Sequence, residues 1–284
     1  MTPDIRPVDG ESDGRERVGP TRFDDWIRRW LEATTGVVAL TALAIGVIAV
    51  AWQPARTVAF TGGVALTLGA VVVVIGIAVE RSARRGHVDP LTVASWVTLT
   101  RGVLLACFVG VLGGIVGAPE GGTGTLTVHG GHIGAGFVAW LPAALFAVAG
   151  LLDAADGMIA RTTDAVTDLG GRLDTELDGF TTLVGAVAVV AMGATSVAFL
   201  TVGIAWYLYA GSCWWRRRRG RPVRDLPVSR VRAPLSAAVL VTIWLALTPI
   251  TTAAQSTLLT TVVAVPFLVN FLWDWLVVTR RVSR

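Results

Sequence analysis

The chain has 284 residues, of which 53% are apolar and 15% are charged, and its mean hydropathy is +0.65. Soluble domains contain about 25% charged residues, so this composition excludes an ordinary soluble domain as well as a disordered chain or a disulfide-rich scaffold. The formal net charge is +4, and all 24 basic residues are arginines. The two cysteines, Cys107 and Cys213, lie in or beside apolar runs, where packing is their expected role. The composition indicates an all-α integral membrane protein.

Eight long uncharged runs predict eight membrane-spanning helices, because a helix needs about 20 apolar residues to cross the hydrocarbon core. The breaker Gln53-Pro54 separates the first two runs. Turns near Gly193 and between Pro249 and Gln255 divide the two longest runs. The expected spans cover residues 34–52, 57–79, 91–117, 134–152, 170–192, 195–215, 234–251 and 256–278.

The arginines support this count, because basic residues collect in the cytoplasmic connections of membrane proteins. In an eight-span arrangement, 22 of the 24 arginines lie on one side of the membrane, together with both termini. Arg56 lies on the other side, and Arg101 lies within the third span. We therefore expect a multi-pass protein of the plasma membrane whose two termini are cytoplasmic.

The first 33 residues are expected to form a cytoplasmic tail. Its last part, from Phe23 to Leu31, carries apolar side chains at helical spacing, including Trp26 and Trp30. This pattern predicts a short amphipathic helix on the membrane surface, ahead of the first span.

Acidic residues are concentrated between the fourth and fifth spans. Seven of the 20 lie within positions 153–178, namely Asp153, Asp156, Asp164, Asp168, Asp174, Glu176 and Asp178. Carboxylates near membrane depth are costly unless something compensates their charge, and a cation would do so. Asp164 and Asp168 are expected to be loop or capping residues instead.

Helical spacing brings four of these aspartates onto two faces. At about 100° per residue, Asp153 and Asp156 share one face of the fourth helix with Gly157, Ala160 and Arg161. On the fifth helix, Gly170, Asp174 and Asp178 recur every four residues, and Glu176 points away. The connection 162–169 is short enough for the two faces to meet. Four aspartates without histidine or cysteine favour a hard cation such as Mg²⁺ or Mn²⁺.

The spacing of these residues carries a family resemblance. All eight fixed positions match the signature of the CDP-alcohol phosphotransferase (CDP-alcohol phosphatidyltransferase) family, and the chain reads Asp153-x2-Asp156-Gly157-x2-Ala160-Arg161-x8-Gly170-x3-Asp174-x3-Asp178. A weaker likeness is the run Thr98-Leu99-Thr100-Arg101, which is similar to the Thr-Leu-x-Arg that opens the first core helix of the family. The Pro-Asn pair that often precedes it there is Ala94-Ser95 here.

The resemblance implies a fold and a reaction. Residues 90–280 would form the six-helix catalytic core of the family, and residues 34–80 would add two transmembrane helices ahead of it. The reaction would transfer a phosphatidyl-type group from CDP-diacylglycerol or CDP-archaeol to a small polar alcohol, with release of CMP. The resemblance also implies a homodimer and a site that holds two Mg²⁺ or Mn²⁺ ions.

By the same resemblance, Asp153, Asp156, Asp174 and Asp178 would bind the metal ions, and Asp178 would also accept the proton of the alcohol. Gly157 and Ala160 would leave room for the nucleotide, and Arg161 would hold a phosphate. Gly170 is a further motif position that is assigned to the substrate site. An acceptor that carries a phosphate would need further cations. The candidates are Arg101, Arg230 and Arg232, with Thr98 beside Arg101, although Arg101 could instead extend its charge to the membrane interface.

Two other functions stay open at this stage. The motif also fits the reverse assignment, in which a CDP-linked choline- or ethanolamine-type head group is transferred to a lipid alcohol. A cation transporter with an acidic site would belong to a different class, and it predicts ionisable groups deep within several spans. On the last helix, Asn270 and Asp274 are four residues apart, and we expect them to end the helix rather than to face the site.

Overall fold

The computed structural model describes residues 21–51, 54, 56–84, 90–116, 126–128, 131–133, 135–162, 167–223 and 231–279. Within these ranges the chain forms long helices, one 3-10 turn and one short antiparallel pair of strands in which Leu126 faces Ile133. In chain order, the elements are α1 (Thr21–Ala51), α2 (Thr57–Arg84), α3 (Val93–Ile115), β1 (Leu126–Val128), β2 (Gly131–Ile133), α4 (Ala135–Thr162), α5 (Asp168–Ala191), η1 (Val197–Phe199), α6 (Leu200–Arg218), α7 (Arg232–Leu247) and α8 (Ala253–Val278).

Each of the eight expected spans corresponds to one of these helices. Six regions are long and apolar enough to cross a membrane: α1, α2, α3, α4, α8 and the stretch from η1 through α6. The other two helices differ for visible reasons, since α5 carries its acidic residues in its first half and α7 has only 16 residues. The chain is thus a helical, multi-pass membrane protein.

The segment expected to form a surface helix is continuous with the helix of the first span. α1 runs without a break from Thr21 to Ala51, so the amphipathic segment around Trp26 and Trp30 is the first part of a 31-residue helix. No proline or glycine occurs between Leu31 and Gly36 that would end the helix at the expected boundary. The two tryptophan rings stack, and the indole N–H of Trp30 donates a hydrogen bond to the carbonyl oxygen of Val72 on α2.

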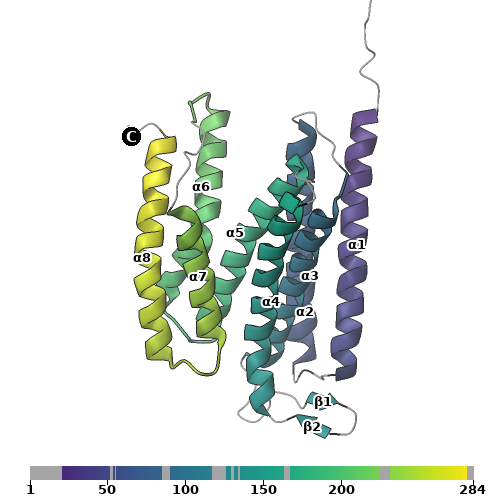
Figure 1. Cartoon of the computed structure of the whole chain (residues 1–284), viewed down its shortest axis with the longest axis vertical. Helices are drawn as coiled ribbons and strands as arrows, with labels where there is room; N and C mark the ends of the chain where they lie inside the picture. Colours follow the sequence, from purple (N-terminus) through teal and green to yellow (C-terminus); the bar gives the residue numbers. More distant parts are fainter. Residues whose placement is uncertain are drawn as a thin grey trace, which may run out of the picture.

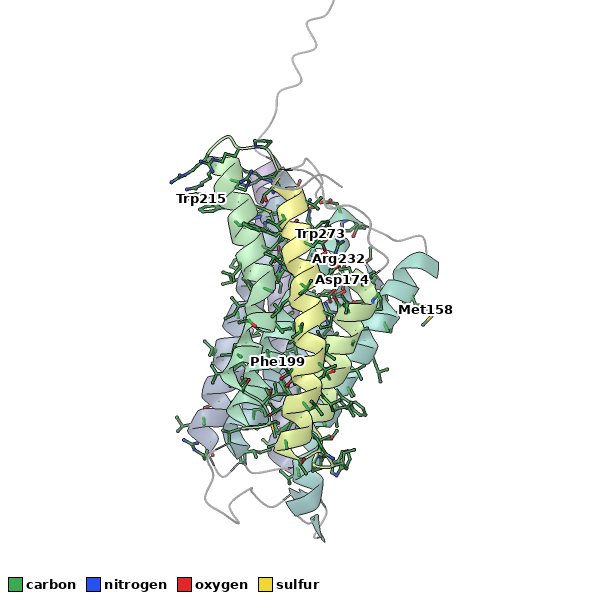
Figure 2. The ribbon with its side chains drawn as sticks, turned by 90° about the vertical axis from the view of Figure 1, so that its left-hand side faces the viewer. Met158, Asp174, Phe199, Trp215, Arg232 and Trp273 are labelled. Carbon is green, nitrogen blue, oxygen red and sulfur yellow. The ribbon has the colours of Figure 1, made fainter. Side chains whose placement is uncertain are left out.

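The helices alternate in direction, and α5 runs obliquely between a group formed by α1–α4 and a group formed by α6–α8 (Figure 1). The C-terminal ends of α2, α4, α6 and α8 therefore lie at the same end of the bundle as the N-terminal ends of α1, α3, α5 and α7 (Figure 1). Asp174 and Arg232 lie toward this end, on the side of Trp215, whereas Phe199 lies toward the other (Figure 2).

Apolar packing holds α3 and α5 at the centre of the molecule. One buried cluster joins α1, α2, α3 and α5 and includes Ile75, Leu99 and Leu177. A second cluster joins α3 to α4–α8 through Phe108 and Ile243, among others. Where α2 crosses α3, a Cβ at Gly113 would lie 2.5 Å from the carbonyl oxygen of Ala59, so glycine is required for this close approach of backbones. The first cluster also packs α3 against α5.

Candidate active site

The four aspartates of the motif come from two neighbouring helices, Asp153 and Asp156 from α4 and Asp174 and Asp178 from α5. Asp153, Asp156 and Asp174 each offer one carboxylate oxygen, and these three oxygens lie within 4.8 Å of one another. This arrangement fits a hard cation, because carboxylate oxygens are the ligands that Mg²⁺ and Mn²⁺ prefer. Asp178 lies beside this group rather than in it, and its side chain is the most exposed of the three that pair with Arg101.

Arg101 on α3 reaches these carboxylates from a fully buried position. Its side chain is 1% exposed, and Nη1 contacts Asp153 and lies 3.0 Å from Oδ1 of Asp178. Nη2 lies 3.3 Å from Oδ1 of Asp174 and also donates to the carbonyl oxygen of that residue at 3.2 Å. A guanidinium at this depth would be very costly without such partners. The guanidinium of Arg101 is therefore buried rather than extended to solvent, and its charge is engaged by three aspartates. We call Arg101 and the four motif aspartates the Arg101 cluster.

Thr98 completes the contribution of α3. It precedes Arg101 by three residues, so both side chains lie on the helix face toward α4 and α5. The Thr98 hydroxyl donates a hydrogen bond of 2.6 Å to Oδ2 of Asp156, and both side chains are buried. A short hydrogen bond to a charged oxygen restricts the rotation of that carboxylate. The Thr-Leu-x-Arg run thus places one neutral and one charged donor against the aspartates.

Gly170 fits the first turn of α5 for a steric reason. Thr167 caps this helix, and its hydroxyl accepts a hydrogen bond of 3.0 Å from the backbone N–H of Gly170. A Cβ at position 170 would lie 2.9 Å from the Thr167 hydroxyl and 3.4 Å from the Ser95 hydroxyl of α3. A larger residue here would disturb both the cap and the approach of α5 to α3, which positions Asp174.

The remaining predicted residues are only partly described. Gly157 follows Asp156 within α4, whereas the side chains of Ala160 and Arg161 and the whole of Arg230 lie outside the described residues. Glu176 points away from the cluster, as expected, and pairs with Arg81 of α2. Asp168 pairs with Arg172 one turn later in α5, at 2.6 Å.

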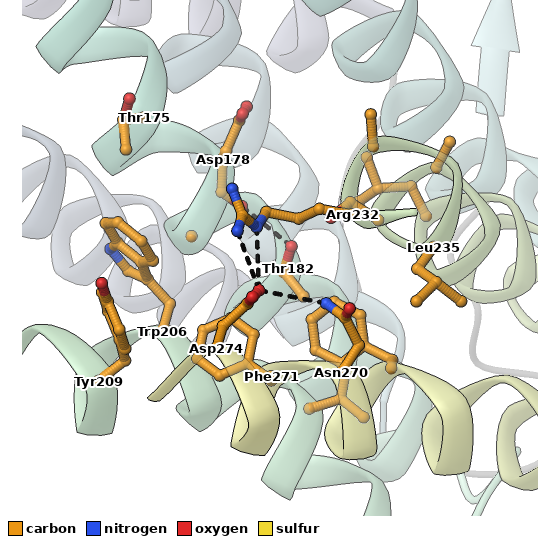
Figure 3. Close-up of a pocket in the computed structure, with 18 of the residues that line it drawn as sticks. Thr175, Asp178, Thr182, Trp206, Tyr209, Arg232, Leu235, Asn270, Phe271 and Asp274 are labelled. Carbon is orange, nitrogen blue, oxygen red and sulfur yellow. Dashed lines mark hydrogen bonds and ion pairs between the residues drawn. The ribbon is translucent and has the colours of Figure 1, made fainter. Parts of the chain in front are cut away.

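A cavity of about 520 Å³ adjoins the aspartates. Asp153 and Asp178 form part of its lining, which otherwise comes from the side chains and backbone of α5, α6, α7 and α8. Most of this lining is apolar and includes the aromatic side chains Trp206, Tyr209 and Phe271 (Figure 3). Trp206 packs directly on Gly179, where a Cβ would lie 2.4 Å from the indole ring.

The same cavity is bordered by a second arginine–aspartate pair (Figure 3). Arg232 of α7 donates to Oδ2 of Asp274 of α8 through Nε at 3.1 Å and Nη2 at 3.0 Å. The side-chain amide of Asn270 donates to the same oxygen at 3.3 Å. Asp274 is buried, and its other oxygen, Oδ1, has no hydrogen-bond partner among the described residues. We call these three residues the Arg232 cluster.

The expectation that Asn270 and Asp274 only end the last helix is therefore wrong. α8 continues to Val278, and both side chains border the cavity. A buried carboxylate needs a partner, and the partner comes from α7, 42 residues earlier. The signal in the sequence is the pair of polar residues four positions apart in an otherwise apolar helix, because such a pair faces one direction.

Comparison with known proteins identifies the family. The model of the CDP-alcohol phosphatidyltransferase family matches residues 91–278. Searches of curated proteins and of solved structures found no match. The matched region runs from just before α3 to the end of α8 and includes both the aspartates and the cavity. The chain therefore belongs to the CDP-alcohol phosphatidyltransferase family, a family of phosphotransferases that act on CDP-alcohols in the membrane.

Proposed function

We propose that this enzyme transfers a phosphatidyl-type group from a CDP-linked lipid, such as CDP-diacylglycerol or CDP-archaeol, to a small polar alcohol. The observation that supports this most strongly is the convergence of Asp153, Asp156 and Asp174, with Asp178 beside them, next to a cavity at one end of the bundle. In this reaction the alcohol oxygen bonds to the phosphorus on the lipid side. The bond from that phosphorus to the bridging oxygen breaks, and CMP leaves.

We propose that Asp153, Asp156, Asp174 and Asp178 hold the two divalent metal ions, Mg²⁺ or Mn²⁺, that the reaction requires. The four carboxylates carry more negative charge than Arg101 compensates, so the site favours added cations. When bound, such ions supply positive charge where it develops on the phosphate oxygens. Arg101 and Thr98 orient the carboxylates.

Asp178 is the proposed base for the alcohol proton. Its side chain is 53% exposed and lines the cavity, so an alcohol there can reach it. The cavity between α5, α6, α7 and α8 is the proposed acceptor site. A base must lie within hydrogen-bonding reach of the proton it removes, and a site bordered by Asp178 satisfies this requirement.

The motif positions Gly157, Ala160, Arg161 and Gly170 are proposed to bind the nucleotide.

The proposed arrangement in the membrane extends the family assignment. All eight helices are proposed to cross the bilayer, with residues 90–280 as the six-helix catalytic domain and residues 34–80 as two additional spans. Among the described residues, the arginines at the ends of α2 and α6 and at the starts of α5 and α7 lie at the end of the bundle that contains the aspartates. We propose that this end faces the cytoplasm, that the membrane is the plasma membrane, and that the enzyme is a homodimer.

Release of CMP from the purified full chain tests this function. The assay contains Mg²⁺ or Mn²⁺, CDP-diacylglycerol or CDP-archaeol, and one alcohol at a time. We expect CMP release to require both the metal and an alcohol. An Asp178→Asn variant should lose this release while it still binds Mn²⁺, and the matched Asp168→Asn variant should retain it. If only a CDP-linked head group with diacylglycerol yields CMP, the direction of transfer is reversed. Absence of CMP from folded protein in both directions would overturn the proposal.

A further inference from the structure

The charges around the cavity carry information on the acceptor alcohol, given the function proposed above. Four charged residues occur in the described lining: Asp153, Asp178 and Asp274 are acidic, and Arg232 is basic. A phosphorylated alcohol brings two negative charges and would need unpaired cationic side chains to hold them. The described lining offers an excess of carboxylates instead.

Neither of the two arginines that the structure describes near the cavity, Arg101 and Arg232, is available for such a phosphate. Arg101 pairs with three aspartates and is 1% exposed. Arg232 directs Nε and Nη2 to the buried carboxylate of Asp274. A phosphate that took Arg232 away from Asp274 would leave a buried carboxylate without its counter-charge, which is strongly unfavourable. The pair is instead neutral as a unit and requires neither an added anion nor an added cation.

The hydrogen bonds of Asp274 are unevenly distributed between its two oxygens. Three N–H groups, two from Arg232 and one from Asn270, converge on Oδ2. Oδ1 accepts none from the described residues, although the residue is only 4% exposed. A buried oxygen without a partner costs free energy, and a hydroxyl group of a bound molecule would remove that cost.

A second buried polar group in the lining is a hydrogen-bond donor and therefore needs an acceptor. The indole N–H of Trp206 has no acceptor among the described residues. A hydroxyl group is both a donor and an acceptor, so an alcohol with several hydroxyls offers a suitable partner to either atom. An ammonium group has donors only. The aromatic rings of Trp206, Tyr209 and Phe271 offer apolar surface to the C–H faces of such a molecule (Figure 3).

We propose that the acceptor is an uncharged polyhydroxy alcohol, bound in the cavity between α5 and α8 and recognised through the carboxylate of Asp274. The Arg232 cluster determines this specificity. It selects a hydroxyl-bearing molecule and disfavours the phosphorylated form of the same molecule, because the charge of Arg232 is already neutralised.

Paired acceptors test this proposal in the full chain. Glycerol is compared with glycerol 3-phosphate, and inositol with inositol 1-phosphate, with ethanolamine as a cationic alcohol. The kcat/KM of CMP release is measured with Mn²⁺ and a saturating CDP-linked lipid. We expect the wild-type enzyme to prefer a neutral polyol over its phosphate by about tenfold or more, the effect of one charged hydrogen bond. A preference for a phosphorylated alcohol or for ethanolamine would overturn the proposal.

An Asp274→Asn variant sharpens the test, because it leaves the charge of Arg232 without compensation. The ratio of kcat/KM for the phosphate to that for the polyol should rise by about tenfold. This ratio is taken on one preparation, so a lower folded fraction does not alter it. The control is Glu80→Gln, which removes an exposed carboxylate paired with Arg84 at 2.6 Å and away from the cavity. An unchanged ratio in Asp274→Asn would contradict the role of Asp274.

Binding measured without a CDP-linked lipid separates this proposal from the proposed function. Saturation-transfer NMR reports contact between each alcohol and the protein in the absence of chemistry. If inositol or glycerol binds to the wild type, loses binding in Asp274→Asn, and yet no alcohol supports CMP release, the polyol site at Asp274 is supported and the proposed function fails. If CMP release occurs but neutral polyols do not bind, the acceptor proposal fails and the proposed function stands.

Discussion

Two arginine–aspartate clusters border the same cavity, and they differ in charge balance. The Arg101 cluster pairs one guanidinium with three carboxylates and adds a fourth, that of Asp156, and oxygens of three of these aspartates lie within 4.8 Å of one another. The Arg232 cluster pairs one guanidinium with one carboxylate and adds a neutral amide. Excess acid favours the binding of added cations proposed for the first cluster, whereas the charges of the second are balanced without them. The two clusters contain the same residue types, but they differ in the ratio of carboxylates to guanidinium groups, and we therefore expect them to differ in function.

The largest expected effect comes from removing one carboxylate of the Arg101 cluster. We expect Asp156→Asn to lower metal-dependent CMP release by about two to three orders of magnitude, because a preorganised charge at the reacting phosphate is lost. The substitution is nearly isosteric and keeps a hydrogen-bond acceptor for Thr98. Steady-state CMP release and Mn²⁺ binding by electron paramagnetic resonance would measure the change. Asp168→Asn on α5 is the control, and activity within a fewfold of the wild type in Asp156→Asn would contradict the proposed metal site.

Substitution of a charged residue in the Arg232 cluster should lower the stability of the protein rather than its affinity for metal. Arg232→Gln leaves Asp274 buried without a counter-charge, and we expect the free energy of unfolding to fall by about 3 kcal/mol. Added Mn²⁺ should not recover this loss. The double variant Arg232→Gln/Asp274→Asn should regain part of it, because the buried charge is removed. Denaturation in micelles measures all three proteins, and a double variant no more stable than Arg232→Gln would argue against a buried ion pair.

The sequence predicted the helices and the acidic site, because both depend on local spacing. Runs of apolar residues set the lengths of the helices, and steps of three and four placed Asp153 with Asp156 and Asp174 with Asp178. Few residues separate α4 from α5 in the sequence, so the two acidic faces were expected to meet. Even there, the sequence did not predict that Asp178 would lie beside the other three carboxylates rather than among them.

Interactions between distant helices could not be predicted in the same way. Arg101 is a single arginine in an apolar run, and the sequence fits either a buried ion pair or a side chain that reaches the interface. The choice depends on how closely α3 packs against α4 and α5. The contact of Asp274 with Arg232 likewise depends on the approach of α8 to α7, and helical spacing within α8 contains no information on it. The continuity of α1 through Leu31 depends on packing as well, since Trp30 bonds to α2.

The Arg101 cluster should show a dependence on metal that the Arg232 cluster lacks. Arg101→Gln removes the only described cation among the four carboxylates, and we expect a loss of about 2 kcal/mol of unfolding free energy in the presence of EDTA. This is less than for Arg232, because Asp174 and Asp178 are partly exposed and water screens them. Saturating Mn²⁺ should then raise the melting temperature of Arg101→Gln by more than that of the wild type. An equal shift in both proteins would show that Arg101 and the metal do not compensate the same charge.

The smallest expected effect isolates a single hydrogen bond within the Arg101 cluster. Thr98→Val keeps the shape of the side chain but removes the donor to Oδ2 of Asp156, and we expect Mn²⁺ binding to weaken about fivefold. Thr100→Val is a matched control on the same helix, because among the described residues its hydroxyl bonds to the backbone oxygen of Trp96. Both variants lose a hydroxyl from α3, so any general effect on the helix is shared. A difference between them measures how far a neutral donor orients a metal-binding carboxylate, and equal affinities would assign that orientation to Arg101 alone.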